Sequence, residues 1–153
     1  MSALTSLPLY AYSLPAAWLL LMAPAFQKRS LLVASMKLDN VAPRSNTAKY
    51  LASDKVDPAL KAKVERLDGA HANGLESFPL WGIAVLFGAY AGIDQSMLNK
   101  AAMVYVTSRL AFNYLYAVQT TEFLGRMRSL VWAVGVGASH FLFITGALKL
   151  HSK

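Results

Sequence analysis

The sequence predicts an all-α protein, an integral membrane four-helix transmembrane bundle. Hydrophobic residues make up 56% of the 153-residue chain, and charged residues make up only 15%, against roughly 25% in a typical soluble domain. Long apolar runs also follow one another along the chain. Four spans of about 20 residues would leave the remainder for loops and helix extensions. A single domain over residues 1–153 therefore fits the length.

The first predicted span covers residues 7–26 and contains no charged residue. A secretory signal peptide is the main alternative, because Ala23-Pro24-Ala25 resembles a small-residue cleavage site. A signal peptide carries its basic residues before the apolar run. Here no Lys or Arg precedes the run, and Lys28-Arg29 follow it. The order of charges therefore favours a span.

Residues 27–66 hold nine of the fifteen basic residues and are predicted to be solvated. Within them, Asp57 is a typical N-cap, and Pro58 suits the first position of a helix. We expect this helix to start at about residue 58 and to continue through the second span, residues 74–92. It would be about 50 Å long, which exceeds the ~30 Å apolar core of a bilayer. Its first turns must therefore stand in water.

Two further spans complete the bundle. In order, the chain is predicted to form a polar turn at 93–100, a third span at 101–118, a linker at 119–128 and a fourth span at 130–148. The third span carries one charge, Arg109, at its middle. The fourth contains a stripe of small residues, Gly135, Ala138 and Ser139, which suits close helix packing.

The distribution of basic residues predicts the orientation. The segment between spans 1 and 2 and the linker between spans 3 and 4 together hold eleven Lys and Arg, whereas the opposite side holds three. The positive-inside rule places both segments in the cytosol and both termini across the membrane, on the lumenal side if the membrane is the endoplasmic reticulum or another endomembrane. Because orientation accounts for most of the net charge of +7, nucleic-acid binding has no support.

The chain contains no cysteine. Disulfides, thiolate metal sites and a cysteine nucleophile are therefore excluded, and we expect no metal site. Any thiol chemistry requires a thiol supplied by another molecule.

The second helix carries one polar face. At 100° per residue, Arg66, Asn73, Glu76 and Ser77 lie on the same side. A carboxylate just inside an apolar span is costly unless it is paired, so Glu76 favours a functional site. The alternative is a helix end whose charges reach into the lipid headgroups, which would suit Arg66. His71 lies on a different face and is expected to be a structural or lipid-edge residue.

The third helix carries a second polar stripe. Its members are Tyr105, Arg109, Asn113, Tyr116 and Thr120. A guanidinium in mid-membrane should face a partner or a wet cavity, because it is expensive there and does not lose its proton. The alternative role for Arg109 is an assembly pair, for example with Glu76.

Depth matching brings the two stripes and the start of the fourth span together at the cytosolic side. The residues expected to converge are Arg66, Asn73, Glu76, Asn113, Tyr116, Arg128 and Ser129. Such a site contains several cations, one anion and hydroxyl donors. It would suit a small zwitterion with excess negative charge.

The chain resembles the membrane-associated proteins in eicosanoid and glutathione metabolism, the MAPEG family. The resemblance covers nearly the whole chain in span order. It is carried by Glu65-Arg66, by the stretch Ala70 to Pro79 with Asn73 and Glu76, by Arg109 followed by Tyr116, and by Arg128 to Trp132. The stretch Asp39 to Arg44 resembles a less characterised fungal and bacterial branch.

The resemblance implies a homotrimer that binds glutathione between neighbouring subunits near the cytosolic surface. Carried over by position, the glutathione-binding residues are Arg66, Asn73, Glu76, Arg109, Asn113 and Tyr116, and the catalytic residues are Arg128 and Ser129. Arg128 would stabilise the thiolate, the reactive form of the sulfur. A lipophilic substrate would enter from the membrane.

Three positions depart from the family pattern. Gly69 stands where the eicosanoid enzymes often carry an arginine, Phe112 occupies a position that is polar in some members, and Trp132 replaces a tyrosine of some members. These differences weaken the eicosanoid assignment more than the glutathione one. The first hypothesis is therefore a glutathione transferase, peroxidase or isomerase, and the second is a non-catalytic lipid-binding or helper protein of the same family.

Overall fold

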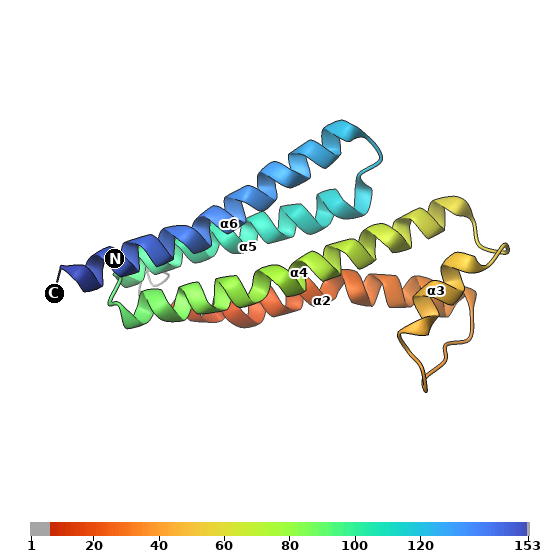
Figure 1. Ribbon diagram of the computed structural model, residues 1–153, viewed down its shortest axis with the longest axis horizontal. Coiled ribbons are helices and arrows are strands. Elements are labelled where there is room, and N and C mark those ends of the chain that lie inside the picture. The colour runs from red at the N-terminus through yellow and green to blue at the C-terminus, as the bar shows by residue number, and fades with distance from the viewer. Residues whose placement is uncertain (1–6, 153) are drawn as a thin grey trace.

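The computed structural model describes residues 7–152 and is helical, as predicted. Its helices are α2 (Leu9–Ser35), α3 (Ser45–Ala52), α4 (Pro58–Tyr90), α5 (Gln95–Val118) and α6 (Glu122–His151). The four long helices run alternately up and down, as two hairpins, α2 with α4 and α5 with α6 (Figure 1). By length and composition, α2 and α6 are each able to cross a membrane.

The first helix is longer than predicted. It continues nine residues beyond Phe26, the predicted end of the span, and stops at Ser35. Gln, Lys and Arg are good helix formers, so the charged residues after Phe26 do not end the helix. The charged residues mark the end of the apolar run at Phe26, whereas the helix itself ends at Ser35.

The second long helix begins where the sequence predicts. The Asp57 side chain accepts a hydrogen bond of 2.7 Å from the Ala59 N–H, and Pro58 is the first helical residue. The helix ends at Tyr90, and Gly92 then has a φ of 78°. This left-handed conformation suits glycine, and it lets the Ile93 N–H donate to the Gly88 carbonyl at 3.0 Å.

Both predicted short connections are wrong in their extent. The polar turn expected at 93–100 ends early, because α5 begins at Gln95. The linker expected at 119–128 also ends early, because α6 begins at Glu122, and the Thr121 hydroxyl caps it by accepting from the Leu124 N–H at 3.4 Å. In both places polar residues occupy the first turns of a helix without breaking it.

The segment 27–66 is more ordered than a solvated linker. It contains α3, a helix that was not predicted. Tyr50 on α3 is 0% exposed and packs with Leu32 of α2 and Val64 of α4 in a small second core. Burial of these side chains holds α3 against the projecting ends of α2 and α4.

A hydrogen-bonded loop leads into α3. The Asp39 carboxylate accepts from the N–H groups of Val41 and Ala42, both at 3.0 Å, and from the Lys49 ammonium at 2.9 Å. Asn46 closes the loop, because its side chain accepts from the Asp39 N–H and donates to the Asp39 carbonyl. The Asp39 to Arg44 stretch is therefore a structural turn that fixes the position of the residues after it.

Replacement of Asp39 tests this turn. The hydrogen bond from Ala42, followed by those from Lys49 and Val41, lowers the pKa of Asp39 from 3.8 to about 2. Because the folded pKa is the lower one, the stabilisation is complete above the unfolded value and is lost as the pH falls through about 2. We expect Asp39→Ala to speed hydrogen exchange at Val41 and Ala42 at neutral pH.

Asp54→Ala is the matched control, because Asp54 is an exposed carboxylate of the same segment. It should leave exchange at Val41 and Ala42 unchanged. Equal exchange rates in the wild type and in Asp39→Ala would contradict the role assigned to this carboxylate.

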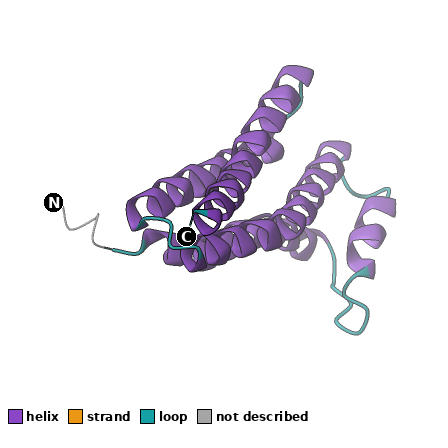
Figure 2. Ribbon diagram, turned by 60° about the vertical axis from the view of Figure 1, so that its left-hand side comes forward, coloured by secondary structure: helices purple, strands orange, loops and turns teal. Residues whose placement is uncertain are grey.

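The bundle is tightest at the end that holds the start of α2 and the end of α6. There the Trp81 and Tyr105 rings stack with their centroids 4.1 Å apart, and the Trp81 indole N–H donates to the Ser13 hydroxyl at 3.1 Å. The two hairpins separate towards the opposite end, the end that carries α3 (Figures 1 and 2). The predicted site residues lie along the separating part of α4, α5 and α6.

Candidate functional site

A cavity of about 170 Å³ lies among α4, α5 and α6 where the hairpins separate. Its lining residues are Asn73, Phe112, Tyr116, Arg128, Ser129 and Trp132. Four of them, one on α4, one on α5 and two on α6, were predicted from the sequence as site residues. Helical spacing and depth matching predicted that these residues of three helices would lie close together, and all four line this cavity.

Arg109 lies beside this cavity and is only 5% exposed. One of its terminal nitrogens donates to the Asn73 side-chain oxygen at 3.1 Å and to the Ser77 hydroxyl at 3.2 Å. The other donates to the Trp132 carbonyl at 3.4 Å. Arg109 thus links α4, α5 and α6, and it fixes the Asn73 amide so that the NH₂ group remains a donor for a ligand.

The alternative pairing of Arg109 with Glu76 is not formed. Within residues 7–152 the Arg109 guanidinium contacts amide, hydroxyl and carbonyl oxygens and no carboxylate. Its carbon Cζ also lies 4.8 Å from the centroid of the Phe112 ring, where a cation is attracted to the aromatic face. The charge is therefore accommodated by neutral groups.

Arg128 and Tyr116 form the most polar wall of the cavity. The Arg128 Cζ lies 4.6 Å from the centre of the Tyr116 ring. The Tyr116 hydroxyl packs against the backbone of α4 at Gly69, where an added Cβ would lie 2.6 Å from that oxygen. A side chain at position 69 would therefore require the Tyr116 ring to shift, so Gly69 and the position of Tyr116 belong together.

The other predicted site residues are arranged differently. Ser129 lines the cavity, but its hydroxyl donates to the Gly125 carbonyl at 3.1 Å. Arg66 lies outside the cavity lining and donates from Nε to the Ala117 carbonyl at 3.3 Å, near the end of α5. Glu76 is exposed on the outer side of α4, and no basic side chain in the described part of the chain pairs with it.

Asn113 points away from the cavity towards α2. Its amide donates to the Leu20 carbonyl at 2.7 Å. Pro24 lies inside α2 and has no N–H to offer this carbonyl, so Asn113 supplies the missing donor. A proline four residues after Leu20 was the sequence signal for this contact. His71, expected to be a structural or lipid-edge residue, also contacts α2, with Nδ1 2.8 Å from the Leu21 carbonyl.

Three residues near the cavity were not predicted as site residues, although Ser77 was placed on the polar face of the second helix and Phe112 and Trp132 were named as departures from the family pattern. Phe112 and Trp132 line it, and Ser77 holds Arg109. Phe112 lies one helical turn before Tyr116, and Trp132 lies one turn after Arg128, so spacing was the available signal. Both are apolar, so neither belongs to the polar stripes that predicted the site.

Comparison with known proteins identifies the family. The MAPEG family profile matches residues 8–148, which span all five helices of the structure up to the last turn of α6. Neither the curated proteins nor the solved structures contain a significant match to the chain. Since the family match extends over more than nine-tenths of the chain, this helical membrane protein belongs to the MAPEG family.

Proposed function

We propose that the protein is an integral membrane enzyme that uses glutathione to act on lipophilic substrates, by transfer, peroxide reduction or isomerisation. The observation that carries this proposal is the cavity at the open end of the bundle. It brings the Arg128 cation, the Tyr116 phenol and the oriented Asn73 amide together within an otherwise apolar bundle. The thiolate and the peptide groups of glutathione match these groups, and its carboxylates and amine would need partners from outside this cavity.

The proposed chemistry requires only a borrowed thiol. Arg128 would lower the pKa of the glutathione sulfur by favouring its charged form, and the thiolate would attack the electrophile. Asn73, held by Arg109, would bind the peptide part of glutathione. Trp132 is partly exposed and would present an apolar surface to the second substrate.

The site is proposed to be completed by a neighbouring protomer of a homotrimer. The cavity of about 170 Å³ is smaller than the roughly 300 Å³ at which ligand pockets begin, so one protomer encloses too little space. Glu76 also lacks a partner within the described residues, although a carboxylate in an apolar span needs one. A partner protomer would supply both the missing wall and a group for Glu76.

The same proposal includes the membrane arrangement. The four long helices would span the membrane, residues 27–66 would face the cytosol, and both termini would lie on the lumenal side of the endoplasmic reticulum or another endomembrane. The concentration of Lys and Arg in residues 27–66 supports this orientation. The cavity, at the α3 end of the bundle, would then open towards the cytosol, where glutathione is supplied.

Two asparagine variants test the binding site. We expect Asn73→Ala to weaken glutathione binding about two- to tenfold, because a hydrogen bond contributes about 0.5 to 1.5 kcal/mol. Asn113→Ala should instead lower the thermal unfolding temperature without changing the affinity, because it leaves the Leu20 carbonyl without a donor. Isothermal titration of the detergent-solubilised protein measures the affinity.

The titration also separates the two hypotheses on function. Absence of glutathione binding in the wild type would reject the enzyme and favour the lipid-binding or helper protein. Loss of affinity in Asn113→Ala, with Asn73→Ala unaffected, would move the site from the α4–α6 cavity to the side of α5 that faces α2.

A further inference from the structure

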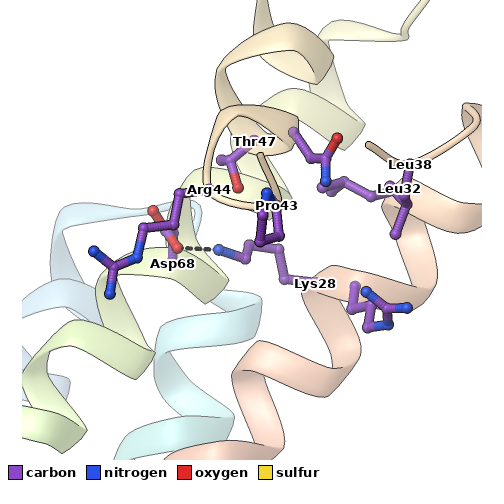
Figure 3. A pocket seen from close by; sticks show the side chains of 9 residues that line it. Lys28, Leu32, Leu38, Pro43, Arg44, Thr47 and Asp68 are labelled. Atoms are coloured by element: carbon purple, nitrogen blue, oxygen red, sulfur yellow. Dashed lines mark hydrogen bonds and ion pairs between the residues drawn. The ribbon is translucent and has the colours of Figure 1, made fainter. Parts of the chain in front are cut away.

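A second, larger cavity of about 420 Å³ lies beside the projecting end of α2. Figure 3 shows it between α2, the loop before α3, and α4. Its lining residues are Lys28, Arg29, Leu32, Leu38, Pro43, Arg44, Asn46, Thr47 and Asp68. None of them lines the proposed glutathione cavity, so the two cavities have separate walls.

The lining of this cavity carries excess positive charge. Lys28, Arg29 and Arg44 are its cations, and Asp68 is its one acidic residue. Lys28 and Asp68 form an ion pair, with side chains 18% and 50% exposed. Within the described residues neither arginine pairs with an acid. The cavity therefore has two uncompensated cations.

The cations of this cavity are carried by helix α2 and by a hydrogen-bonded loop. The Asp39 turn positions the loop that carries Pro43 and Arg44, and Leu32 in the lining is 4% exposed. In Figure 3 Arg44 lies on the same side of the cavity as the Lys28–Asp68 pair. In that view the Asp68 carboxylate lies between Arg44 and Lys28, so an anion bound there would compete with Asp68 for Lys28.

The cavity begins, at Lys28, at the depth expected for lipid headgroups, and it extends beyond that layer at Leu32. Phe26 ends the apolar run, and at 1.5 Å per residue Lys28 lies about 3 Å beyond it and Leu32 about 9 Å beyond it. The headgroup layer on each side of a bilayer is about 5 to 7 Å thick. Its wall also includes apolar Leu38 and Pro43, which a purely aqueous ion site would not need.

From these observations we infer that the cavity binds the phosphate group of an anionic phospholipid of the cytosolic leaflet. Arg44 and Lys28 bind the phosphate oxygens. The position relative to the bilayer rests on the proposed membrane orientation. The binding itself does not depend on glutathione or on any activity of the protein.

The probes are short-chain phosphatidate, short-chain phosphatidylcholine and inorganic phosphate, added to the full chain in a neutral detergent. Thermal unfolding and native mass spectrometry report binding. Phosphatidate should raise the unfolding temperature and appear bound, because its phosphate is anionic and unshielded. The zwitterionic lipid should do neither. Stabilisation by inorganic phosphate equal to that by phosphatidate would reject a lipid as the ligand.

Three variants test the assignment of the residues. Arg44→Gln should weaken phosphatidate binding about three- to tenfold, because a charge-assisted contact is lost at an exposed position. Asp68→Asn should strengthen binding, because Lys28 is released from its acidic partner. Lys55→Gln is the matched control: Lys55 is exposed in the same segment but lies outside the cavity, so the affinity should not change.

Equal losses of phosphatidate affinity in Arg44→Gln and Lys55→Gln would show that the whole basic segment attracts the anionic lipid. That result would overturn the proposed site. Weaker binding in Asp68→Asn would also overturn it, because the carboxylate would then support the ligand. Competition by glutathione would assign the cavity to glutathione. Each result is independent of whether the proposed enzyme activity exists.

Discussion

Arg128→Leu is expected to lower the turnover of a lipophilic electrophile about ten- to hundredfold while leaving the fold intact. Arg128 lines the candidate cavity, stands over the Tyr116 ring, and makes no ion pair within the described residues. Removing it therefore breaks no internal salt bridge. A charge-assisted hydrogen bond contributes roughly 1.5 to 3 kcal/mol, which gives this range of rates if the contact strengthens towards the transition state.

The same variant should raise the pKa of bound glutathione. Loss of the cation removes the group that favours the charged sulfur, so the thiolate fraction near neutral pH should fall. Ultraviolet absorbance of the thiolate against pH measures this shift. Turnover of the electrophile, assayed at the same pH values, should fall in parallel and recover as the pH is raised.

Arg126→Leu provides the control. Arg126 lies on the same turn of α6 and carries the same charge, but it is exposed and pairs with Glu122 at 2.6 Å. An exposed pair of this kind contributes at most about 1 kcal/mol to stability. If both variants lost turnover equally, a general effect of positive charge would replace the specific role of Arg128. An unchanged thiolate pKa in Arg128→Leu would remove that role.

The sequence predicted the long helices better than their ends. Apolar runs located the four long helices, but the structure extends α2 to Ser35 and starts α5 at Gln95 and α6 at Glu122. The sequence becomes polar at the point where a helix leaves the apolar layer of the membrane. The helix itself ends only where its backbone N–H and C=O groups no longer find hydrogen-bond partners along the helix. Helix α3 was missed because its buried residue Tyr50 packs on Leu32 and Val64, which are distant in sequence.

The candidate site could be predicted only in part for a related reason. Helical periodicity and depth matching place Asn73, Tyr116 and Arg128 together, because both follow from regular helix geometry. The direction of Asn113 depends on a carbonyl freed by Pro24 in another helix. No periodicity within α5 contains that information.

Close packing around Arg109 gives the largest effect expected on stability. Gly135 of α6 lies against α5, and a Cβ added there would lie 2.7 Å from the Ser108 hydroxyl and 3.0 Å from an Arg109 terminal nitrogen. Both neighbours are buried, and Arg109 is held by Asn73 and Ser77, so neither can move freely. We expect Gly135→Ala to lower the free energy of unfolding by about 1 to 3 kcal/mol.

Gly137→Ala is the matched control on the same helix. A Cβ at Gly137 meets no atom within 4 Å, and both substitutions give α6 the same gain in helix propensity. The difference in unfolding temperature between the two variants in one detergent therefore isolates the packing against α5. Gly135→Ala should also weaken glutathione binding, because a displaced Arg109 no longer orients the Asn73 amide. Equal stability of the two variants would mean that α5 and α6 leave room for a methyl group at Gly135. Arg109 would then not be held tightly between α4, α5 and α6.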